Sequence, residues 1–291
     1  MYNAIAANKR NTVIIMAVFI GLVGAVGWAI SYVNGDRNLV YWVIGVAVIY
    51  ALIQYFIADK LAVAITGAQA IEKKDNPRLY RIVENLAITE GMPMPKVYII
   101  DDPAPNAFAT GRNPAHSVVA ATTGILELMD DRELEAVMAH EMSHVRNYDI
   151  RVSMIAFGLV SAIGILSDLA FRMMFFSNDR RENSNPIILI VGIILIILAP
   201  IVAMLIQLAI SRQREYLADA SGALTTRDPE GLAAALEKLM HHGRPMRQQN
   251  TSTAHLFFSN PLKPGSLVKL FSTHPPLQER IARLRTNANK F

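Results

Sequence analysis

The sequence of 291 residues contains no cysteine and little charge. Without cysteine the chain forms no disulfide, and any metal site has to use histidine and carboxylate ligands. Charged residues make up 18% of the chain, against about 25% in an average soluble domain. The net charge of +4 is small and dispersed, and no basic stripe alternates with aromatic residues, so nothing here favours a nucleic-acid partner.

The lack of charge is concentrated in three runs, 11–35, 38–58 and 183–211, which carry no charged residue at all. Each run exceeds the roughly 20 apolar residues, at about 1.5 Å rise each, that cross a hydrocarbon core about 30 Å thick. We therefore predict four membrane helices, at 12–33, 39–57, 152–171 and 187–210. The third is the weakest because it contains Asp168, and a charge inside a span has to reach water or a partner.

The first apolar run has some features of a signal peptide but predicts a retained span. Lys9 and Arg10 precede it, as in the positive region of a signal peptide. The run 12–33 is longer than the about 7–15 apolar residues of such a peptide, and no small-x-small cleavage site follows it.

The predicted spans divide the chain into two hydrophobic hairpins, 1–58 and 152–210, and two aqueous segments, 59–151 and 211–291. Basic residues flank the spans on the side of the aqueous segments: Lys9, Arg10, Lys60, Arg146, Arg151, Arg212 and Arg214. The positive-inside rule then places both aqueous segments in the cytoplasm. Three arginines in the second connector, Arg172, Arg180 and Arg181, oppose this and leave open whether the second hairpin crosses fully.

The aqueous segments combine helical and strand patterns. Apolar residues recur at helical spacing in 78–88, and 130–146 begins with the acidic turn that is typical of a helix start. Short strands are predicted at 96–100 and 117–121, and further helices at 230–240 and 276–284. We therefore expect a mainly α membrane protein with four hydrophobic helices and an α+β aqueous domain built on a small sheet.

The predicted helix 130–146 contains His140-Glu141-Met142-Ser143-His144, which matches H-E-x-x-H. Residues four apart lie on one face of a helix, so both imidazoles can bind one metal ion. Glu141 lies beside them, where it can act as general base. The alternative is a helix whose polar face carries two histidines by chance, but the helical context is what the motif requires.

A catalytic zinc ion takes three protein ligands, and the third has to come from elsewhere in the chain. Glu215, just after the fourth span, is the best candidate. Because Glu215 and Asp219 are four residues apart, one can bind the metal while the other hydrogen-bonds a ligand imidazole. The alternative is that these acids only solvate a helix end. Two crossings between His144 and Glu215 return the chain to its starting side, so the three ligands can meet.

These motifs, in this order and between two hydrophobic hairpins, resemble the HtpX family of bacterial membrane metalloproteases. The wider group includes the CAAX prenyl proteases, and the similarity covers nearly the whole chain. The resemblance implies a gluzincin-like catalytic domain with one zinc ion, facing the cytoplasm from the bacterial inner membrane. It also implies polypeptide substrates, chiefly damaged or misfolded membrane proteins, and a role in quality control under stress.

The resemblance also assigns roles to two other places in the chain. Asn106, Ala107, Phe108 and Ala109 are similar to the gluzincin edge strand that holds an extended substrate by main-chain hydrogen bonds. His274 resembles the histidine of a His-Pro pair that donates to the oxyanion of the tetrahedral intermediate. The alternatives are an ordinary short strand and an N-terminal helix cap.

Two other functions share parts of this pattern. A CAAX prenyl protease acting on lipidated C-termini has the same zinc site, but we expect it to need more spans to enclose a chamber. A membrane scaffold without activity would retain the metal site as a vestige. Structural zinc sites usually close all four positions with protein ligands, and the intact Glu141 disfavours that reading. The sequence indicates no oligomeric state.

Overall fold

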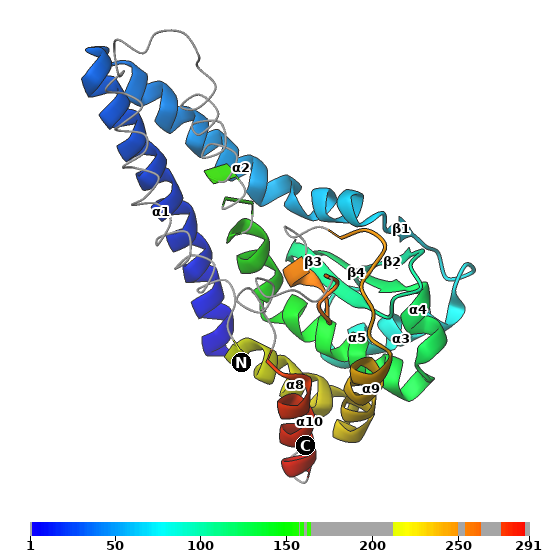
Figure 1. Cartoon of the computed structure of the whole chain (residues 1–291). Coiled ribbons are helices and arrows are strands. Elements are labelled where there is room, and N and C mark those ends of the chain that lie inside the picture. The colour runs from blue at the N-terminus through cyan, green and yellow to red at the C-terminus, as the bar shows by residue number, and fades with distance from the viewer. Residues whose placement is uncertain are drawn as a thin grey trace. The chain divides into compact units, whose positions relative to one another are not determined.

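The computed structural model describes residues 2–156, 158–159, 162–163, 212–249, 254–262 and 275–288 (Figure 1). Its described elements, in chain order, are α1 (Tyr2–Asn34), α2 (Leu39–Thr66), β1 (Gln69–Ala70), α3 (Pro77–Glu90), β2 (Lys96–Ile100), β3 (Ala107–Asn113), β4 (His116–Thr122), α4 (Thr123–Leu128), α5 (Asp131–Arg146), α8 (Arg212–Thr226), α9 (Pro229–His242), the 3-10 turn η1 (Ala254–Leu256) and α10 (Leu277–Thr286). The prediction of a mainly helical chain with a small sheet is confirmed.

The chain divides into two compact units. We call the first the sheet unit, which comprises Met1–Asn8, Asp59–Ser153 and Ile210–Phe291. The second, the hairpin unit, comprises Lys9–Ala58 and Met154–Ala209. Segments far apart in the sequence therefore build the sheet unit together, and the start of α1, Tyr2–Asn8, belongs to it.

In the hairpin unit, α1 and α2 approach each other closely where α1 has small residues. A Cβ at Gly27 would lie 2.7 Å from Cγ1 of Val43, and one at Gly24 would lie 3.2 Å from Ile44. The two glycines, three apart, therefore let the helix backbones come together, as small residues do between membrane helices. The Phe19 and Tyr50 rings, with centroids 5.9 Å apart, continue the contact.

The outward faces of this hairpin are apolar. Large hydrophobic side chains such as Trp42, which is 75% exposed, lie on the surface of α2. Two stretches, Ala4–Trp28 of α1 and Leu39–Ile57 of α2, are long and apolar enough to cross a membrane. They correspond to the first two predicted spans. The remaining two predictions, 152–171 and 187–210, lie mostly or wholly outside the described residues.

The sheet unit contains a four-stranded mixed sheet with the order β1-β2-β4-β3. The central strand β4 pairs parallel with β2 and antiparallel with β3, while β1 pairs antiparallel with β2. The run Ser117–Thr122 is buried throughout, which explains its nearly continuous apolar sequence. Strand β3 lies at one end of the sheet, and no further strand of the sheet pairs with its outer edge among the described residues.

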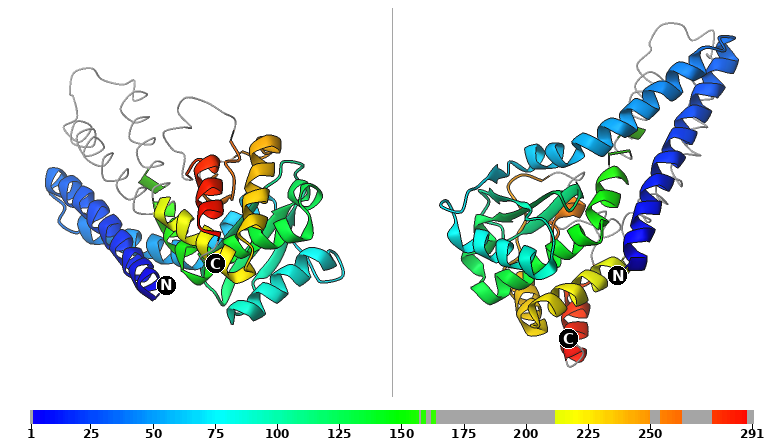
Figure 2. Two further views of the ribbon diagram at one scale, coloured as in Figure 1. Left: turned by 90° about the horizontal axis from the view of Figure 1, so that it is seen from below. Right: turned by 180° about the vertical axis from the view of Figure 1, so that it is seen from behind.

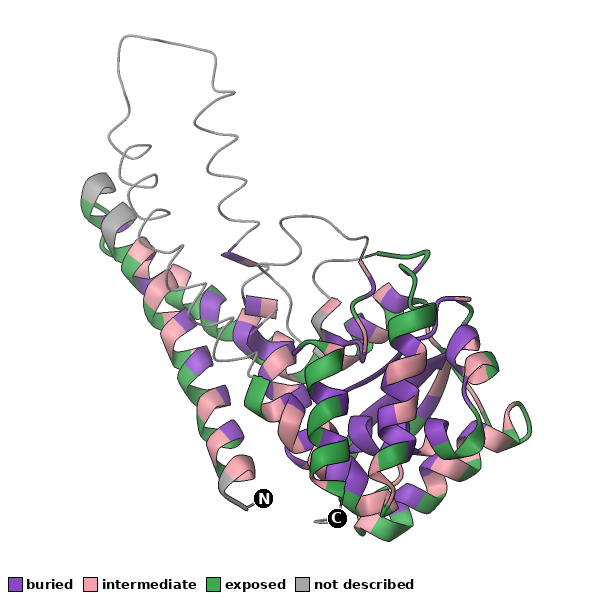
Figure 3. Ribbon diagram, turned by 60° about the horizontal axis from the view of Figure 1, so that its bottom comes forward, coloured by how far each residue is buried: buried purple, intermediate pink, exposed green. Residues whose placement is uncertain are grey.

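Helix α5 is the centre of the sheet unit (Figure 1). It packs against β3 and β4 and against α3, α8 and α9. Asp130 starts it with a capping box: its side chain accepts from the N–H of Glu133, whose side chain accepts from the N–H of Asp130. This satisfies backbone donors that a helix start leaves unpaired. Figure 3 shows buried residues gathered in the sheet and in the helices packed on it.

The C-terminal helices complete the unit. Helix α8 packs along α5, and α9 and α10 lie side by side next to it (Figure 2). Asp228 caps α9 through the N–H of Gly231 and also pairs with Arg132 at the start of α5. Each helix predicted in the aqueous segments is present, with ends that differ from the prediction by at most two residues, because caps, rather than apolar spacing, set the boundaries.

Candidate metal centre

The two histidines of the H-E-x-x-H run project from one face of α5. His140 is 1% exposed, and its Nε2 lies 3.2 Å from Nε2 of His144. Two nitrogens on a tetrahedral zinc ion, each about 2.0–2.1 Å from the metal, lie about 3.4 Å apart. The spacing of the two imidazoles therefore fits a shared ion.

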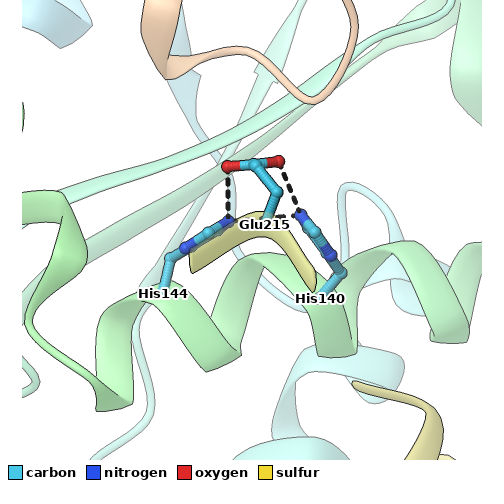
Figure 4. Close-up of side chains that lie close together, drawn as sticks. All are labelled: His140, His144 and Glu215. Carbon is cyan, nitrogen blue, oxygen red and sulfur yellow. Dashed lines mark hydrogen bonds and ion pairs between the residues drawn. The ribbon is translucent and has the colours of Figure 1, made fainter. Parts of the chain in front are cut away.

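Glu215 on α8 supplies a third donor to the same place (Figure 4). Its Oε2 lies 3.8 Å from Nε2 of His140, and its Oε1 lies 3.6 Å from Nε2 of His144. One donor atom from each residue falls within 4.8 Å of the others. A fourth ligand from the protein is not needed, because a catalytic ion keeps one position open.

A glycine allows α8 to come close enough to α5. A Cβ at Gly222 would lie 3.0 Å from the backbone nitrogen of His140. Any larger residue would force the helices apart at the turn that carries His140. The separation of Glu215 from the histidines therefore depends on this glycine, seven residues farther along α8.

Asp219, one turn after Glu215, contacts the far side of the His140 ring. Its Oδ1 lies 3.0 Å from Nδ1 of His140. Arg280 on α10, fully buried, donates to both oxygens of this carboxylate, from Nε at 2.9 Å and from Nη2 at 2.6 Å. The carboxylate is thus fixed on one side by Arg280 and turns the Nε2 of His140 toward Glu215.

Asp149 performs the same task for His144. Its Oδ2 lies 3.0 Å from Nδ1 of His144. The chain leaves α5 at Asn147, and Tyr148 takes a left-handed conformation with φ of 62°. That turn brings Asp149 back to the ring of a residue only five positions earlier.

The electrostatics of the two imidazoles differ. Burial lowers the pKa of His140 to about 4, against the hydrogen bond with Asp219. Burial also lowers the pKa of His144, but the Asp149 hydrogen bond and the charge of Glu215 outweigh it and raise that pKa to about 9. Burial alone would raise the pKa of Asp219, but Arg280 and His140 lower it to about 2.

Of these shifts, only the raised pKa of His144 reflects nearby negative charge. Among the described residues, four buried carboxylates line the site and two guanidinium groups lie beside them: Glu141, Asp149, Glu215 and Asp219, with Arg214 and Arg280. With both imidazoles neutral, as metal ligands are, these described groups leave two negative charges without a partner charge. A buried site of this kind is stabilised by a divalent cation, since unpaired buried charge is strongly unfavourable. Donor type, spacing and charge therefore all fit a bound metal ion.

Strand β3 lies next to this cluster, and its outer edge is partly paired with the chain itself. Phe258 donates its N–H to the carbonyl of Ala107 at 2.8 Å, and Phe257 forms an antiparallel bridge with Phe108. The side chain of Asn106 donates to the carbonyl of Ser259 at 2.8 Å and accepts from its N–H at 3.0 Å. The Phe258 ring lies 4.9 Å from the His140 ring.

Comparison with known proteins identifies the arrangement. Residues 73–288 match the profile of peptidase family M48. Over all 291 residues the chain is 54% identical to a "Protease HtpX homolog" of Tropheryma whipplei (strain Twist), with both chains covered completely. A protein with the same description from Streptococcus gordonii is 45% identical, with 98% of this chain and 99% of that one covered.

The chain belongs to peptidase family M48. It is therefore a metallopeptidase, and its apolar helices and its HtpX relatives make it a membrane protein. The resemblance to the HtpX family found in the sequence is confirmed. The crystal structure of S. mikatae Ste24p has the same fold, with a TM-score of 0.52 at 20% identity, over 93% of this chain and 62% of that chain.

Within this M48 peptidase, the structure brings together most of the residues that the sequence singled out. His140, His144 and Glu215 meet, Asp219 joins them, and Glu141 is buried beside them with 2% exposure. Asn106, Ala107, Phe108 and Ala109 form the edge beside the cluster. His274 lies outside the described residues.

The sequence interpretation missed Asp149 and Arg280. Asp149 had a weak local signal, since it is an acid close behind the second histidine. Arg280 had none, because its contact with Asp219 spans 61 positions of the chain.

Proposed function

We propose that this M48 peptidase is a zinc-dependent endopeptidase of the bacterial inner membrane that cuts damaged or misfolded membrane proteins on the cytoplasmic side. The observation that carries the proposal is the triangle of His140, His144 and Glu215 donor atoms with Glu141 buried beside it. The protein would also cut unfolded soluble polypeptides that reach the same site.

Zinc is the metal that best matches the donors. Two imidazoles and one carboxylate, with a position left for water, form the ligand set of a catalytic zinc ion. Softer metals favour thiolate ligands, and the chain has no cysteine; magnesium and calcium favour sites made of oxygen ligands alone. We assign His140, His144 and Glu215 as the three ligands of one ion per chain.

Glu141 is the proposed general base. When bound, zinc polarises the scissile carbonyl and makes a water molecule acidic enough to lose a proton near neutral pH. Glu141 takes that proton as the water oxygen adds to the carbonyl carbon, and then delivers it to the nitrogen of the leaving amine. The peptide C–N bond breaks, and one water molecule is consumed for each bond cut.

The carboxylates behind the ligands fix the rings. Asp219 accepts from Nδ1 of His140 and Asp149 from Nδ1 of His144, so in each ring Nε2 is left with its lone pair toward the metal. Arg280 holds Asp219 in place by two charge-assisted hydrogen bonds. His274 is proposed to donate to the developing oxyanion, on the strength of its family resemblance alone.

We propose that substrates add as a strand to the outer edge of β3. The main-chain carbonyl of Asn106 points toward β4, and that of Ala107 points to the outer side of the sheet. Main-chain groups alternate along a strand, so the N–H and C=O of Ala109 point to the outer side as well. Asn106 and Ala107 hold the residues Phe257–Ser259, and Ala109 is 3% exposed, so a substrate strand would pair with the edge at Ala109 after displacing the segment that covers it. Main-chain pairing of this type accepts many side chains, which suits a protease that removes unfolded proteins.

Charge and hydropathy support the proposed location. Basic residues flank the predicted spans beside both aqueous segments, which favours a cytoplasmic site. His144 lies eight residues before the predicted start of the third span, and Glu215 five after the predicted end of the fourth, so both proposed ligands are close in sequence to predicted spans. Such a site would reach cytoplasmic loops and frayed ends of membrane proteins.

A second candidate, processing of lipidated C-termini, has weaker support. The relatives described as HtpX homologs are 45–54% identical over nearly the full chain, whereas Ste24p is 20% identical. Cleavage of prenylated peptides in preference to unfolded polypeptides would favour this alternative.

The experiment that tests the proposed activity combines metal content with cleavage. The full chain, purified in detergent and loaded with zinc, should carry one ion and cut casein, and a chelator should abolish both. Casein left intact by the zinc-loaded protein would contradict the proposal.

To test on which side of the membrane the protein cuts, cleavable sequences are placed at graded distances from a model span. Cutting at the outer face or mid-bilayer, instead of only on the cytoplasmic side, would overturn the location.

A further inference from the structure

The first residues of α1 reach the metal centre through a buried asparagine. Asn8 is 5% exposed and is the last residue of α1 that belongs to the sheet unit. Its Nδ2 donates to the backbone carbonyl of Asn147 at 2.8 Å and to Oδ1 of Asp149 at 2.6 Å. Both partners are acceptors, so the two hydrogens of the amide group are both used.

These two contacts fix the turn that follows α5. Asn147 ends the helix, Tyr148 is left-handed, and Asp149 returns toward the histidine. A left-handed non-glycine residue is unfavourable by itself and persists where neighbouring contacts hold it. Asn8 supplies such contacts on both sides of Tyr148, because it binds the residue before and the residue after.

The two oxygens of Asp149 have different partners. Oδ2 lies 3.0 Å from Nδ1 of His144, whereas Oδ1 accepts from Asn8 and lies 3.9 Å from Nη1 of Arg214. The carboxylate is 4% exposed. Hydrogen bonds to buried charged groups are among the stronger ones in proteins, so loss of the Asn8 amide would leave Oδ1 with only the more distant Arg214 and hold the carboxylate less firmly.

We propose that Asn8 is a positioning residue of the metal centre, which acts through Asp149 to orient His144 and so couples the N-terminal end of the membrane hairpin to metal binding. The inference rests on the proposed zinc site. It implies that a catalytic fragment beginning after α2 would contain all three ligands and still bind the metal more weakly.

The test measures zinc affinity in the full chain by competition with a chromogenic chelator. A Glu141→Gln background prevents self-digestion and leaves the ligands intact. Asn8→Ala should weaken zinc binding about tenfold, the lower end of the range for residues that support ligands. Asn8→Asp should weaken it further, because a second carboxylate would face Asp149. The matched control is Asn11→Ala, the same change on the same helix three residues later.

A double-variant cycle separates positioning from a general effect on folding. If Asn8 acts through Asp149, then Asn8→Ala should cause no further loss of zinc affinity in an Asp149→Ala background. The melting temperature of each metal-free variant reports folding separately. Should Asp149→Ala prove unstable, the ranking of Asn8→Asp below Asn8→Ala, with Asn11→Ala unchanged, decides the matter.

The possible results are distinct. Unchanged zinc affinity in Asn8→Ala, or an equal loss with and without Asp149, would overturn the positioning role while leaving the zinc site in place. Absence of zinc from the parent protein would overturn the proposed function, and this inference with it.

Discussion

The two units of the molecule differ in what they place on the outside and what they bury. In the hairpin unit, Trp42, Val46 and Ile49 are 75%, 65% and 59% exposed. In the sheet unit, Glu141, Asp219 and Arg280 are 2%, 4% and 0% exposed. Apolar groups lie outside in one unit, and charged groups lie inside in the other.

Each departure from the usual pattern of a soluble protein indicates a partner of matching chemistry. Exposed apolar surface on long uncharged helices is stable against hydrocarbon, and buried carboxylates in excess are stable around a divalent cation. Membrane insertion and metal binding are therefore inferred from the same kind of observation: a group whose exposure or burial would be unfavourable if water were its only partner.

The largest effect is expected from the proposed general base in the sheet unit. Glu141→Gln removes the proton acceptor but leaves His140, His144 and Glu215 as they are. Peptide hydrolysis should fall by about 10²–10⁴-fold, the usual contribution of a positioned general base. Zinc content, measured together with casein cleavage, should be unchanged. Near-normal cleavage by the purified variant would show that another group takes the proton.

The next prediction tests whether the exposed apolar surface of the hairpin faces lipid. Ile49→Arg lies near the middle of the candidate span in α2 and should disfavour membrane insertion by about 2.5–3.5 kcal/mol. Retention of the protein in membranes after alkaline extraction checks it.

A matched control comes from the sheet unit. Ile88 on α3 is 74% exposed, so Ile88→Arg should change stability by no more than about 0.5 kcal/mol. Equal membrane retention for Ile49→Arg and Ile88→Arg would mean that both surfaces face water, and the contrast between the units would be lost.

A smaller effect is expected from Asp219, the carboxylate that contacts Nδ1 of His140. Asp219→Ala removes the acceptor of His140 and leaves Arg280 buried without its main partner. Zinc affinity should fall about 10–100-fold, whereas Glu215→Ala should lose the metal more completely. Equilibrium metal content after dialysis ranks the two variants. A larger loss in Asp219→Ala than in Glu215→Ala would exchange the roles of the two carboxylates.

The smallest predicted effect concerns the edge beside the buried cluster. Ala109→Pro removes one outward N–H from β3, and proline is tolerated at an edge whose N–H does not join the sheet. Loss of one main-chain hydrogen bond, about 0.5–1.5 kcal/mol, should raise KM by up to about tenfold with little change in kcat. Zinc content and melting temperature control for folding. An unchanged KM would place the substrate elsewhere.

Local patterns predicted the parts of the site that depend on one helix. His140 and His144 are four residues apart on α5, and Glu215 and Asp219 are four apart on α8, so helical spacing sufficed to pair them. The strand at 96–100 was predicted with the observed ends because a short apolar run is bounded by turn residues.

Contacts between distant segments were not predictable in this way. Asn8 and Asp149 are 141 positions apart, and the partner of Asp219, Arg280, is on another helix. The pairing of Phe257–Ser259 with β3 depends on strand register, which a lone sequence fixes only where a tight turn joins the strands. Buried polar networks form by tertiary packing, and no period in the sequence reports them.

The most direct measurement of the central claim, that the buried charges surround a catalytic zinc ion, is the zinc X-ray absorption spectrum of the full chain. The account predicts one ion per chain with four nitrogen or oxygen ligands at about 2.0–2.1 Å, two of them imidazoles, and loss of the signal in Glu215→Ala. A third imidazole, or an unchanged spectrum in Glu215→Ala, would contradict it.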